Sequence, residues 1–399
     1  MKLLRIAYCR AYQTGLRLAL PVLPYRKPKI LNHVSEVADV YQRHHIHSVL
    51  LVTDRSIREL GLTEPLEKAL AEKHIRCTVF DRVVPNPTTD IIADAVKMFR
   101  KNHCRGLIGF GGGSSMDCAK AAGAQLAQPH KTLNQMGGIL KVHRPIPLLT
   151  AVPTTSGTGS ETTLAAVVTD SRTRHKYAIN DFPLIPSYAL LDPEITLHLP
   201  KLITATTGMD ALTHAVEAYI GRSTTKETRR EAEEAVRMIF KNLEAVYKNG
   251  ENRRKRKILA KAAFLAGDAF SQSYVGYVHA IAHSLGGKYN IAHGLANAVI
   301  LPYVLDEYGS RVYAPLARLA RIAGVANAGD SNKKAAKAFI NAIRRMNRNM
   351  NIPDKLEGIR REDIPELAAY ADAEANPLYP VPTEWDQQKL ATIYEEILA

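Results

Sequence analysis

The hydrophobic pattern of the chain changes near Pro200, and this change limits the folds that the chain can adopt. Before Pro200, short apolar runs such as LLVTD, CTVF, GLIGF and LLTAV alternate with segments whose apolar residues recur at helical spacing. Short apolar runs are typical of strands that are buried on both faces of a parallel sheet, with helices covering those faces. After Pro200 only the helical spacing continues. The sequence therefore predicts an α/β N-terminal domain with a mainly parallel, Rossmann-like sheet and an all-α C-terminal domain.

The length and composition agree with this division. A chain of 399 residues with 46% hydrophobic residues is too long for one compact core. We expect a basic N-terminal extension over residues 1–29, the α/β domain over residues 30–199 and the helical domain over residues 200–399. No apolar run reaches the roughly 18 residues that span a bilayer. The four cysteines stand singly, without disulfide or CxxC spacing, which favours a reducing compartment, by default the cytoplasm.

Acidic and imidazole side chains in the helical domain form the strongest candidate for a chemical site. Asp210 and His214, in GMDALTHAVEAY, are four residues apart, so both leave the same face of a helix. His279 and His283 repeat this spacing, and His293 follows shortly after. A carboxylate with two or three imidazoles suits a divalent ion such as Fe²⁺ or Zn²⁺. The spacing leaves open which histidines bind, and the alternative is a set of buried core histidines with hydrogen-bond partners.

A glycine-rich turn in GLIGFGGGSSMDCAK indicates a phosphate-binding site in the α/β domain. Residues 106–110 are predicted to form a buried strand, and a helix is predicted from Ser115 onward. The glycines at 111–113 let the backbone approach a ligand closely. Ser114 is the predicted N-cap, where exposed N–H groups and the helix dipole attract a diphosphate. The motif departs from GxGxxG, so on its own it is weak evidence for nucleotide binding.

The strand predicted at residues 47–54 ends in an acidic residue, Asp54. An acidic residue at this position can bind a ribose 2′-hydroxyl and repel a 2′-phosphate, which favours NAD over NADP. Arg55 weakens this argument, because an arginine beside the acid can accommodate a phosphate. The alternative role of Asp54 is the N-cap of a helix that begins near Ser56.

A loop rich in hydroxyl groups follows the strand predicted at residues 147–152. Its sequence, VPTTSGTGSETT over residues 152–163, offers hydroxyls and N–H groups to a ligand. This loop, the glycine-rich turn and VVPNPTTD from Val83 each follow strands of one β–α alternation. We therefore expect all of them to lie at the same edge of the sheet.

Four motifs together resemble the iron-containing, or group III, alcohol dehydrogenase family. They are GGGSSMDCAK, PTTSGTGSET, GMDALTHAVEAY and HAIAHSLGGKYNIAHGLANAVILPYV. The resemblance extends from about Pro28 to the C-terminus. It implies the dehydroquinate synthase-like fold of this family, an NAD-dependent oxidoreductase and a homodimer.

The resemblance also implies roles for individual residues. His283 is implied as a catalytic or proton-relay group beside the metal and the nicotinamide. The implied metal ligands are Asp210, His214, His279 and His293. The implied cofactor-binding residues are Asp54, Asn86, Gly112, Gly113, Ser114, Thr154, Thr155 and Lys176.

The activity implied by the resemblance is hydride transfer between a primary alcohol, or its aldehyde, and NAD(H). A divalent ion, Fe²⁺ or alternatively Zn²⁺, would polarise the substrate oxygen. Alternatives with the same fold are a polyol or glycerol-phosphate-type dehydrogenase and a dehydroquinate synthase-like lyase. A phosphate-bearing substrate would require basic residues near the site, for which Lys288 is a candidate.

The net charge of +14 raises a different class of function, binding to nucleic acid or to a membrane surface. The basic run RRKRK at residues 253–257 has no interleaved aromatic residues, so we expect no nucleic-acid partner. The N-terminal extension has no acidic residue before Glu36, and its short apolar run is broken by Pro21. We expect this extension to be a helix packed on the sheet domain with its basic face in water. The alternatives are a weak contact with a membrane surface and an organelle presequence.

Overall fold

The structure, a computed structural model, describes residues 2–173 and 175–399. By its internal contacts the chain divides into two compact units. The sheet unit is Pro24–His198, and the helical unit combines the residues up to Leu23 with Leu199–Ala399. Met1, the first residue of the predicted extension, lies outside the described residues.

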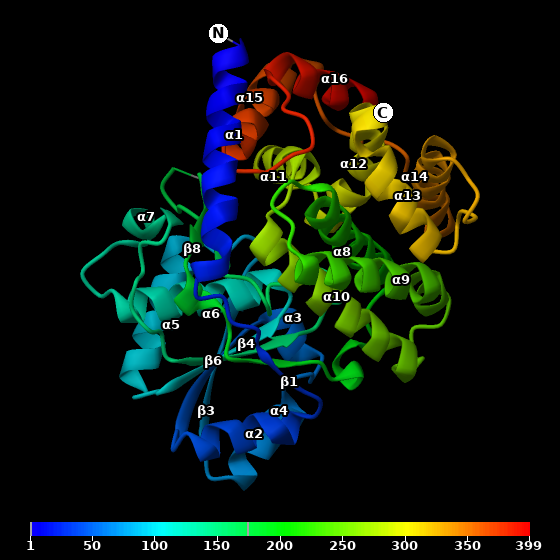
Figure 1. The fold of residues 1–399 in the computed structure, drawn as a ribbon. Helices are drawn as coiled ribbons and strands as arrows, with labels where there is room; N and C mark the ends of the chain where they lie inside the picture. The colour runs from blue at the N-terminus through cyan, green and yellow to red at the C-terminus, as the bar shows by residue number, and fades with distance from the viewer. Residues whose placement is uncertain (1, 174) are drawn as a thin grey trace. The chain divides into compact units, whose positions relative to one another are not determined.

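A six-stranded parallel sheet forms the centre of the sheet unit (Figure 1). The strand order is β1-β9-β6-β4-β2-β3, and every neighbouring pair is parallel. The prediction of a mainly parallel, Rossmann-like sheet is therefore confirmed. The strands are β1 (Lys29–Leu31), β2 (Ser48–Asp54), β3 (Arg76–Val83), β4 (Gly106–Gly111), β6 (Leu148–Pro153) and β9 (Tyr188–Leu190).

The uninterrupted apolar run of β2 is explained by two hydrophobic cores, one on each face of the sheet. Leu50 and Val52 belong to one core, while Val49 and Leu51 belong to the other. Successive side chains of a strand point to opposite faces, so a strand covered on both sides has no polar positions to alternate with. The covering helices are α2 (Val34–Arg43), α3 (Arg55–Glu59), α4 (Glu64–Glu72), α5 (Thr89–Lys101), α6 (Gly113–Ala127) and α7 (Leu133–Met136).

The ends of three central strands lie at the same edge of the sheet. β4 pairs in parallel with both β2 and β6, so these strands end together at Asp54, Gly111 and Pro153. The loop after β6 leads into a second, smaller sheet, which the sequence patterns did not predict. It contains an antiparallel pair and one short parallel strand: β7 (Ala165–Thr169), β8 (Lys176–Asn180) and β5 (Gly138–Ile139).

The helical unit is built around α8, which is surrounded by α9, α10 and α12. Most of α8 is buried, and its many Ala, Thr and Gly residues let these neighbours approach closely. In the described residues after Pro200 no strand forms, apart from one isolated bridge, so the all-α prediction is confirmed. The helices are α8 (Lys201–Ile220), α9 (Lys226–Lys248), α10 (Arg253–Ser273), α11 (Tyr277–Tyr289), α12 (His293–Tyr308), α13 (Tyr313–Ile322), α14 (Asn332–Asn349), α15 (Ile364–Ala375) and α16 (Gln387–Ile397).

Helix α1 (Lys2–Ala19) belongs to the helical unit. The guanidinium of Arg10 donates to the carbonyl oxygens of Val381 and Pro382, at 2.8 and 3.2 Å, and Gln13 donates to the carbonyl of Tyr379 at 2.8 Å. The prediction that this segment packs on the sheet domain is therefore wrong. The polar side chains of α1 form hydrogen bonds with carbonyl groups of a loop that is distant in the chain. A local sequence pattern does not predict such contacts. Among the described helices, none is both long and apolar enough to cross a membrane.

Candidate metal centre and cofactor loops

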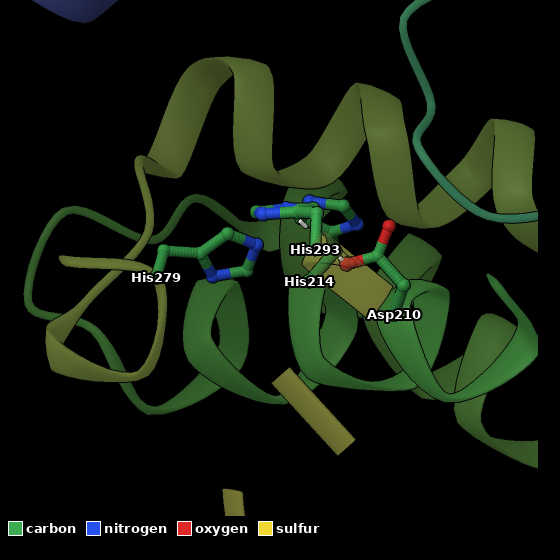
Figure 2. A group of neighbouring side chains, drawn as sticks. All are labelled: Asp210, His214, His279 and His293. Atoms are coloured by element: carbon green, nitrogen blue, oxygen red, sulfur yellow. Dashed lines mark ion pairs between the residues drawn. The ribbon is translucent and has the colours of Figure 1, made fainter. Parts of the chain in front are cut away.

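Four side chains from three helices of the helical unit converge (Figure 2). Asp210 and His214 lie one turn apart on α8, His279 lies in the first turn of α11, and His293 is the first residue of α12. Each residue offers one ligand atom, and these atoms all lie within 4.8 Å of one another. Three of the residues are buried, whereas the side chain of His293 is 35% exposed. The structure thus brings together the four residues implied as ligands.

The amide group of Asn297, one turn after His293 on α12, lies among these ligand atoms. Its Nδ2 is 2.7 Å from Asp210 Oδ1 and 3.1 Å from the Nε2 atoms of both His279 and His293. An amide nitrogen has two protons, so it cannot satisfy three acceptors fully. The lone pairs therefore face a common centre that a cation would fill better than an amide, and this carboxylate–imidazole set suits Fe²⁺ or Zn²⁺.

Glu217, which the sequence analysis missed, fixes the orientation of His279. Its Oε2 is 2.6 Å from Nδ1 of His279, and its carboxylate also accepts the backbone N–H groups of Gly276 and Val278, both at 2.9 Å. A β-carbon at Gly276 would lie 2.7 Å from the carboxylate, so only glycine allows this approach. With its Nδ1 proton donated to Glu217, His279 turns the lone pair of Nε2 toward the centre. The signal in the sequence was the spacing of Glu217, three residues after His214 on the same face of α8.

Burial shifts the titration of this pair. It raises the pKa of Glu217 to about 7, although the backbone N–H donors act in the opposite direction. It also lowers the pKa of His279 well below its ordinary value, and the neighbouring imidazoles add to this effect. His279 is therefore neutral near pH 7, the form in which an imidazole can bind a metal.

His283 lies one turn after His279 but is held by different partners. Its Nδ1 is 2.6 Å from Oε1 of Glu374, which also accepts the hydroxyl of Tyr379 at 2.7 Å. Its ring stacks on that of His293 with the centroids 5.0 Å apart. His283 is therefore beside the group of four without belonging to it. Glu374 and Tyr379 lie about 90 residues further along the chain, and no local spacing pointed to them.

The turn between β4 and α6 brings several of the predicted cofactor residues together. Gly111 has φ +149°, and its carbonyl accepts the N–H of Thr154 at 2.9 Å. The N–H of Asn86 donates to the hydroxyl of Ser114 at 3.3 Å. The loops after β3, β4 and β6 therefore meet at one edge of the sheet, as predicted.

The prediction that Ser114 is the N-cap of the helix is wrong. The N-cap is Gly112, which has an extended backbone, and α6 begins at Gly113. Ser114 lies inside the first turn because its hydroxyl accepts a hydrogen bond from the loop of Asn86 instead of capping its own helix. The first backbone N–H groups of α6 therefore follow a glycine without a capping side chain, an arrangement that suits a phosphate group.

The hydroxyl-rich loop contributes Thr154 and Thr155 to this edge. A β-carbon at Gly112 would lie 4.0 Å from the methyl group of Thr155, so the two are neighbours. The hydroxyl oxygen of Thr155 is buried and has no hydrogen-bond partner among the described residues. A buried hydroxyl without a partner costs about 1–3 kcal/mol of free energy, which a bound ligand would recover.

Asp54 and Lys176 occupy the margins of this edge. Oδ1 of Asp54 accepts the N–H of Ile57 at 3.0 Å, so the predicted alternative, an N-cap, is present, although the helix begins at Arg55. Its Oδ2 lies close to Gly111, because a β-carbon there would be 3.7 Å away. Lys176 is the first residue of β8, and its positive charge acts to lower the pKa of Asp117 of α6.

Asp117 itself has a structural role. Burial raises its pKa, while Lys120, hydrogen bonds from Ser160 and Val167, and Lys176 oppose the shift. The carboxylate accepts the hydroxyl of Ser160 at 2.8 Å and the N–H of Val167 at 3.1 Å, which fastens the hydroxyl-rich loop to α6.

Lys288, the candidate for a substrate phosphate, is paired instead with Asp363, at 2.7 Å, and with Glu366.

Comparisons with known proteins show which family the chain is similar to. Residues 30–193 match a family model described as iron-containing alcohol dehydrogenase, and residues 204–398 match the C-terminal model of the Fe-containing alcohol dehydrogenase family. A 1,3-propanediol dehydrogenase of Citrobacter freundii is 38% identical over 87% of this chain and 90% of its own length. An NAD-dependent methanol dehydrogenase of Bacillus methanolicus is 35% identical over 85% of this chain and 89% of its own length. The crystal structure of a 1,3-propanediol oxidoreductase superimposes with a TM-score of 0.90 at 35% identity, covering 94% of this chain and 100% of that one.

Proposed function

Since the chain belongs to the iron-containing alcohol dehydrogenase family, we propose that it transfers a hydride between a primary alcohol, or its aldehyde, and NAD(H). The observation that carries this proposal is the convergence of four ligand atoms within 4.8 Å of one another. Asp210, His214, His279 and His293 would hold the ion, Fe²⁺ or alternatively Zn²⁺. A divalent ion held by these residues would supply Lewis acidity to the substrate oxygen.

Protein groups around this ion would orient its ligands and move the proton of the substrate hydroxyl. Glu217 holds His279 with its Nε2 lone pair facing the ligand set. His283, whose Nδ1 is engaged by Glu374, has Nε2 left to exchange a proton with the substrate hydroxyl. Tyr379 restrains Glu374 through its hydroxyl and so restrains the His283 ring as well.

The sheet unit would bind NAD through the loops at the carboxyl edge of its sheet. The N–H groups at the start of α6 suit the diphosphate, and the unpartnered hydroxyl of Thr155 provides a buried donor. Asp54 retains a second carboxylate oxygen for a ribose hydroxyl, which favours NAD over NADP. The proposed cofactor residues remain Asp54, Asn86, Gly112, Gly113, Ser114, Thr154, Thr155 and Lys176.

A simple primary alcohol or diol is the substrate class that the relatives support, because their names refer to 1,3-propanediol and methanol. A phosphate-bearing substrate has less support, since the carboxylates of Asp363 and Glu366 already neutralise Lys288. We further propose a homodimer in a reducing compartment such as the cytoplasm. The free state of Cys9, Cys77, Cys104 and Cys118 is compatible with this location.

The test is NADH production from a panel of primary alcohols and diols by protein that has been stripped of metal and refilled separately with Fe²⁺ and Zn²⁺. We expect no turnover without metal and recovery with at least one ion, whose identity would give the working metal. NADPH production with NADP should be slower. The proposal would be wrong if the metal-loaded protein bound NAD but oxidised no alcohol and reduced no aldehyde.

A further inference from the structure

Helix α1 and the short 3₁₀-helix that follows it, η1 (Leu20–Val22), carry a concentration of exposed apolar side chains. Leu4, Leu18 and Val22 are 77%, 75% and 83% exposed, and Tyr8 is 61% exposed. Exposed large apolar residues are otherwise scattered along the described chain. Single exposed apolar residues need no explanation, but a group of them on one element does.

Five exposed residues lie along α1 and η1, and we call them the α1 stripe: Leu4, Tyr8, Tyr12, Leu18 and Val22. At about 100° per residue, the four members on α1 fall on one face, together with Ala11 and Gly15. The rings of Tyr8 and Tyr12 lie 6.4 Å apart, which agrees with this arrangement. The stripe is therefore a continuous apolar surface and not a set of unrelated side chains.

Helix α1 lies beside α15 in the helical unit (Figure 1). The face opposite the α1 stripe holds the helix there. Cys9 and Gln13 are buried there, and Gln13 donates to the carbonyl of Tyr379. Arg10 pairs with Glu384 at 3.3 Å, and Arg5, at the edge of the stripe, pairs with Asp372 of α15. Because one face already has its partners, the α1 stripe is left facing away from the helical unit that carries it.

Charge distinguishes between the possible partners of this stripe. Seven Lys and Arg residues fall within the first 29 positions, whereas the first acidic residue is Glu36. Two of the seven, Arg5 and Arg10, are paired with carboxylates of the helical unit, which leaves a smaller excess of positive charge in this segment. A second copy of the chain docked on the same stripe would bring two such cationic segments together, and like charges repel. A surface of anionic headgroups would instead attract the segment while its apolar side chains enter the headgroup boundary.

We propose that α1 docks this protein on the surface of an anionic phospholipid bilayer. Leu4, Leu18 and Val22 would enter the boundary between headgroups and acyl chains, and Tyr8 and Tyr12 would lie at headgroup level, where amphipathic rings are favoured. The helix would lie on the membrane without spanning it. Residues 1–29 precede the segment that matches the family model, which begins at residue 30, so docking is separate from hydride transfer.

The test is flotation of the full chain with vesicles of phosphatidylcholine alone and of phosphatidylcholine mixed with phosphatidylglycerol. We expect binding only to the mixed vesicles, weakened by added salt because the attraction is screened. The triple variant Leu4→Gln, Leu18→Gln, Val22→Gln should reduce the bound fraction by about tenfold or more. The matched control is Leu60→Gln with Leu202→Gln, which changes leucines that are 70% and 54% exposed elsewhere and should bind like the wild type.

NADH production should be unchanged in both variants, so a failure of docking is distinguishable from a failure of the proposed enzyme activity. Absence of wild-type binding to the mixed vesicles would overturn the proposal, as would a triple variant that binds like the wild type. Sedimentation velocity measures the oligomeric state of the wild type and of the triple variant. If the wild type does not bind vesicles and forms an oligomer that the triple variant does not form, the stripe is a contact between copies of the chain and the proposal is wrong.

Discussion

The candidate metal centre in the helical unit and the candidate cofactor loops in the sheet unit position their groups by different means. In the metal centre the candidate ligands are side chains, and at least one of them, His279, is oriented by another side chain, Glu217. In the cofactor loops the positions depend on the backbone. Examples are the glycine turn at Gly111 and the first turn of α6, which has no capping side chain. One site is fixed by buried side-chain hydrogen bonds, and the other by the path of the chain.

This difference follows from the ligands that each site would take. A small cation needs several lone pairs directed at one point, which side chains from three helices supply in this unit. A dinucleotide needs donors along an extended diphosphate, which the backbone N–H groups of turns supply at the edge of a parallel sheet. Single side-chain changes should therefore disable the metal centre, whereas the cofactor loops should tolerate them better than changes of backbone geometry.

The largest effect is expected for His279→Ala in the metal centre. Loss of a ligand should remove the metal and lower turnover by about a thousandfold, because several kcal/mol of transition-state stabilisation depend on the ion. Metal content by mass spectrometry and NADH production should fall together. A variant that kept its metal would contradict the assignment of His279 as a ligand.

His283→Ala should lower turnover by about a hundredfold with the metal content unchanged, because it removes a proton-transfer group but no ligand. Glu374→Gln should have a smaller effect in the same direction, because the ring of His283 loses its charged partner. Glu366→Gln on the same helix is the control and should leave turnover unaltered. Equal metal loss in His279→Ala and His283→Ala would overturn the distinction between the two histidines.

Glu217→Gln tests whether orientation by a buried carboxylate matters to the metal centre. We expect metal affinity to fall by about 10–100-fold, the usual effect of removing a partner of a metal-binding histidine. Competition with a chelator measures this directly, without relying on activity. Glu233→Gln, a carboxylate bonded to Tyr219 away from the centre, is the control. Unchanged affinity would mean that Glu217 only supports the loop before α11.

Gly111→Ala should damage the cofactor loops through the backbone. An alanine β-carbon would meet the Ser115 hydroxyl oxygen at 2.5 Å, and φ of +149° disfavours any side chain. We expect NAD affinity to fall by roughly 20-fold, within the 1–3 kcal/mol typical of backbone strain, with metal affinity unchanged. Gly329→Ala, where nothing lies within 4 Å, is the control for calorimetric titration with NAD. Equal NAD affinity in the two variants would argue against binding at this turn.

Thr155→Val should have the smallest effect. Because the hydroxyl has no partner in the described structure, its removal should not lower the free energy of unfolding. NAD affinity should nevertheless fall by roughly fivefold, equivalent to about 1 kcal/mol for one hydrogen bond. Denaturant unfolding and NAD titration separate the two effects, with Thr383→Val as the control for an unpartnered hydroxyl in the helical unit. A loss of stability without a loss of affinity would show that Thr155 is structural.

Local patterns predicted most of the architecture. The apolar run of β2 and the glycine-rich end of β4 were recognisable because a strand buried on both faces has no polar positions, and because a close turn requires glycine. The helical spacing after Pro200 predicted the all-α unit for a similar reason. The candidate ligand set could be predicted because Asp210 and His214 are neighbours on one turn and three histidines cluster at 279, 283 and 293, from which the family resemblance selected His279 and His293.

The hydrogen-bond partners of these residues were harder to predict from the sequence. Glu217 could have been found from its place on the face of α8 that carries Asp210 and His214. Glu374 and Tyr379 could not, because their contact with His283 depends on the packing of α15 against α11. The side on which α1 packs was also undetermined, since the face that packs is held by hydrogen bonds from Arg10 and Gln13 to a distant loop and not by the exposed apolar residues of the helix.

By itself, then, the sequence determined the two kinds of domain, the turns at the sheet edge and the residues able to bind a metal, because each depends on spacing within one element or on the intrinsic conformational freedom of glycine. Tertiary structure decided which carboxylate orients which histidine, that Gly112 and not Ser114 precedes α6, and which face of α1 remains exposed. These features depend on groups that are far apart in the chain and meet only when the helices and loops pack. Periodicity within a segment contains no information about such contacts.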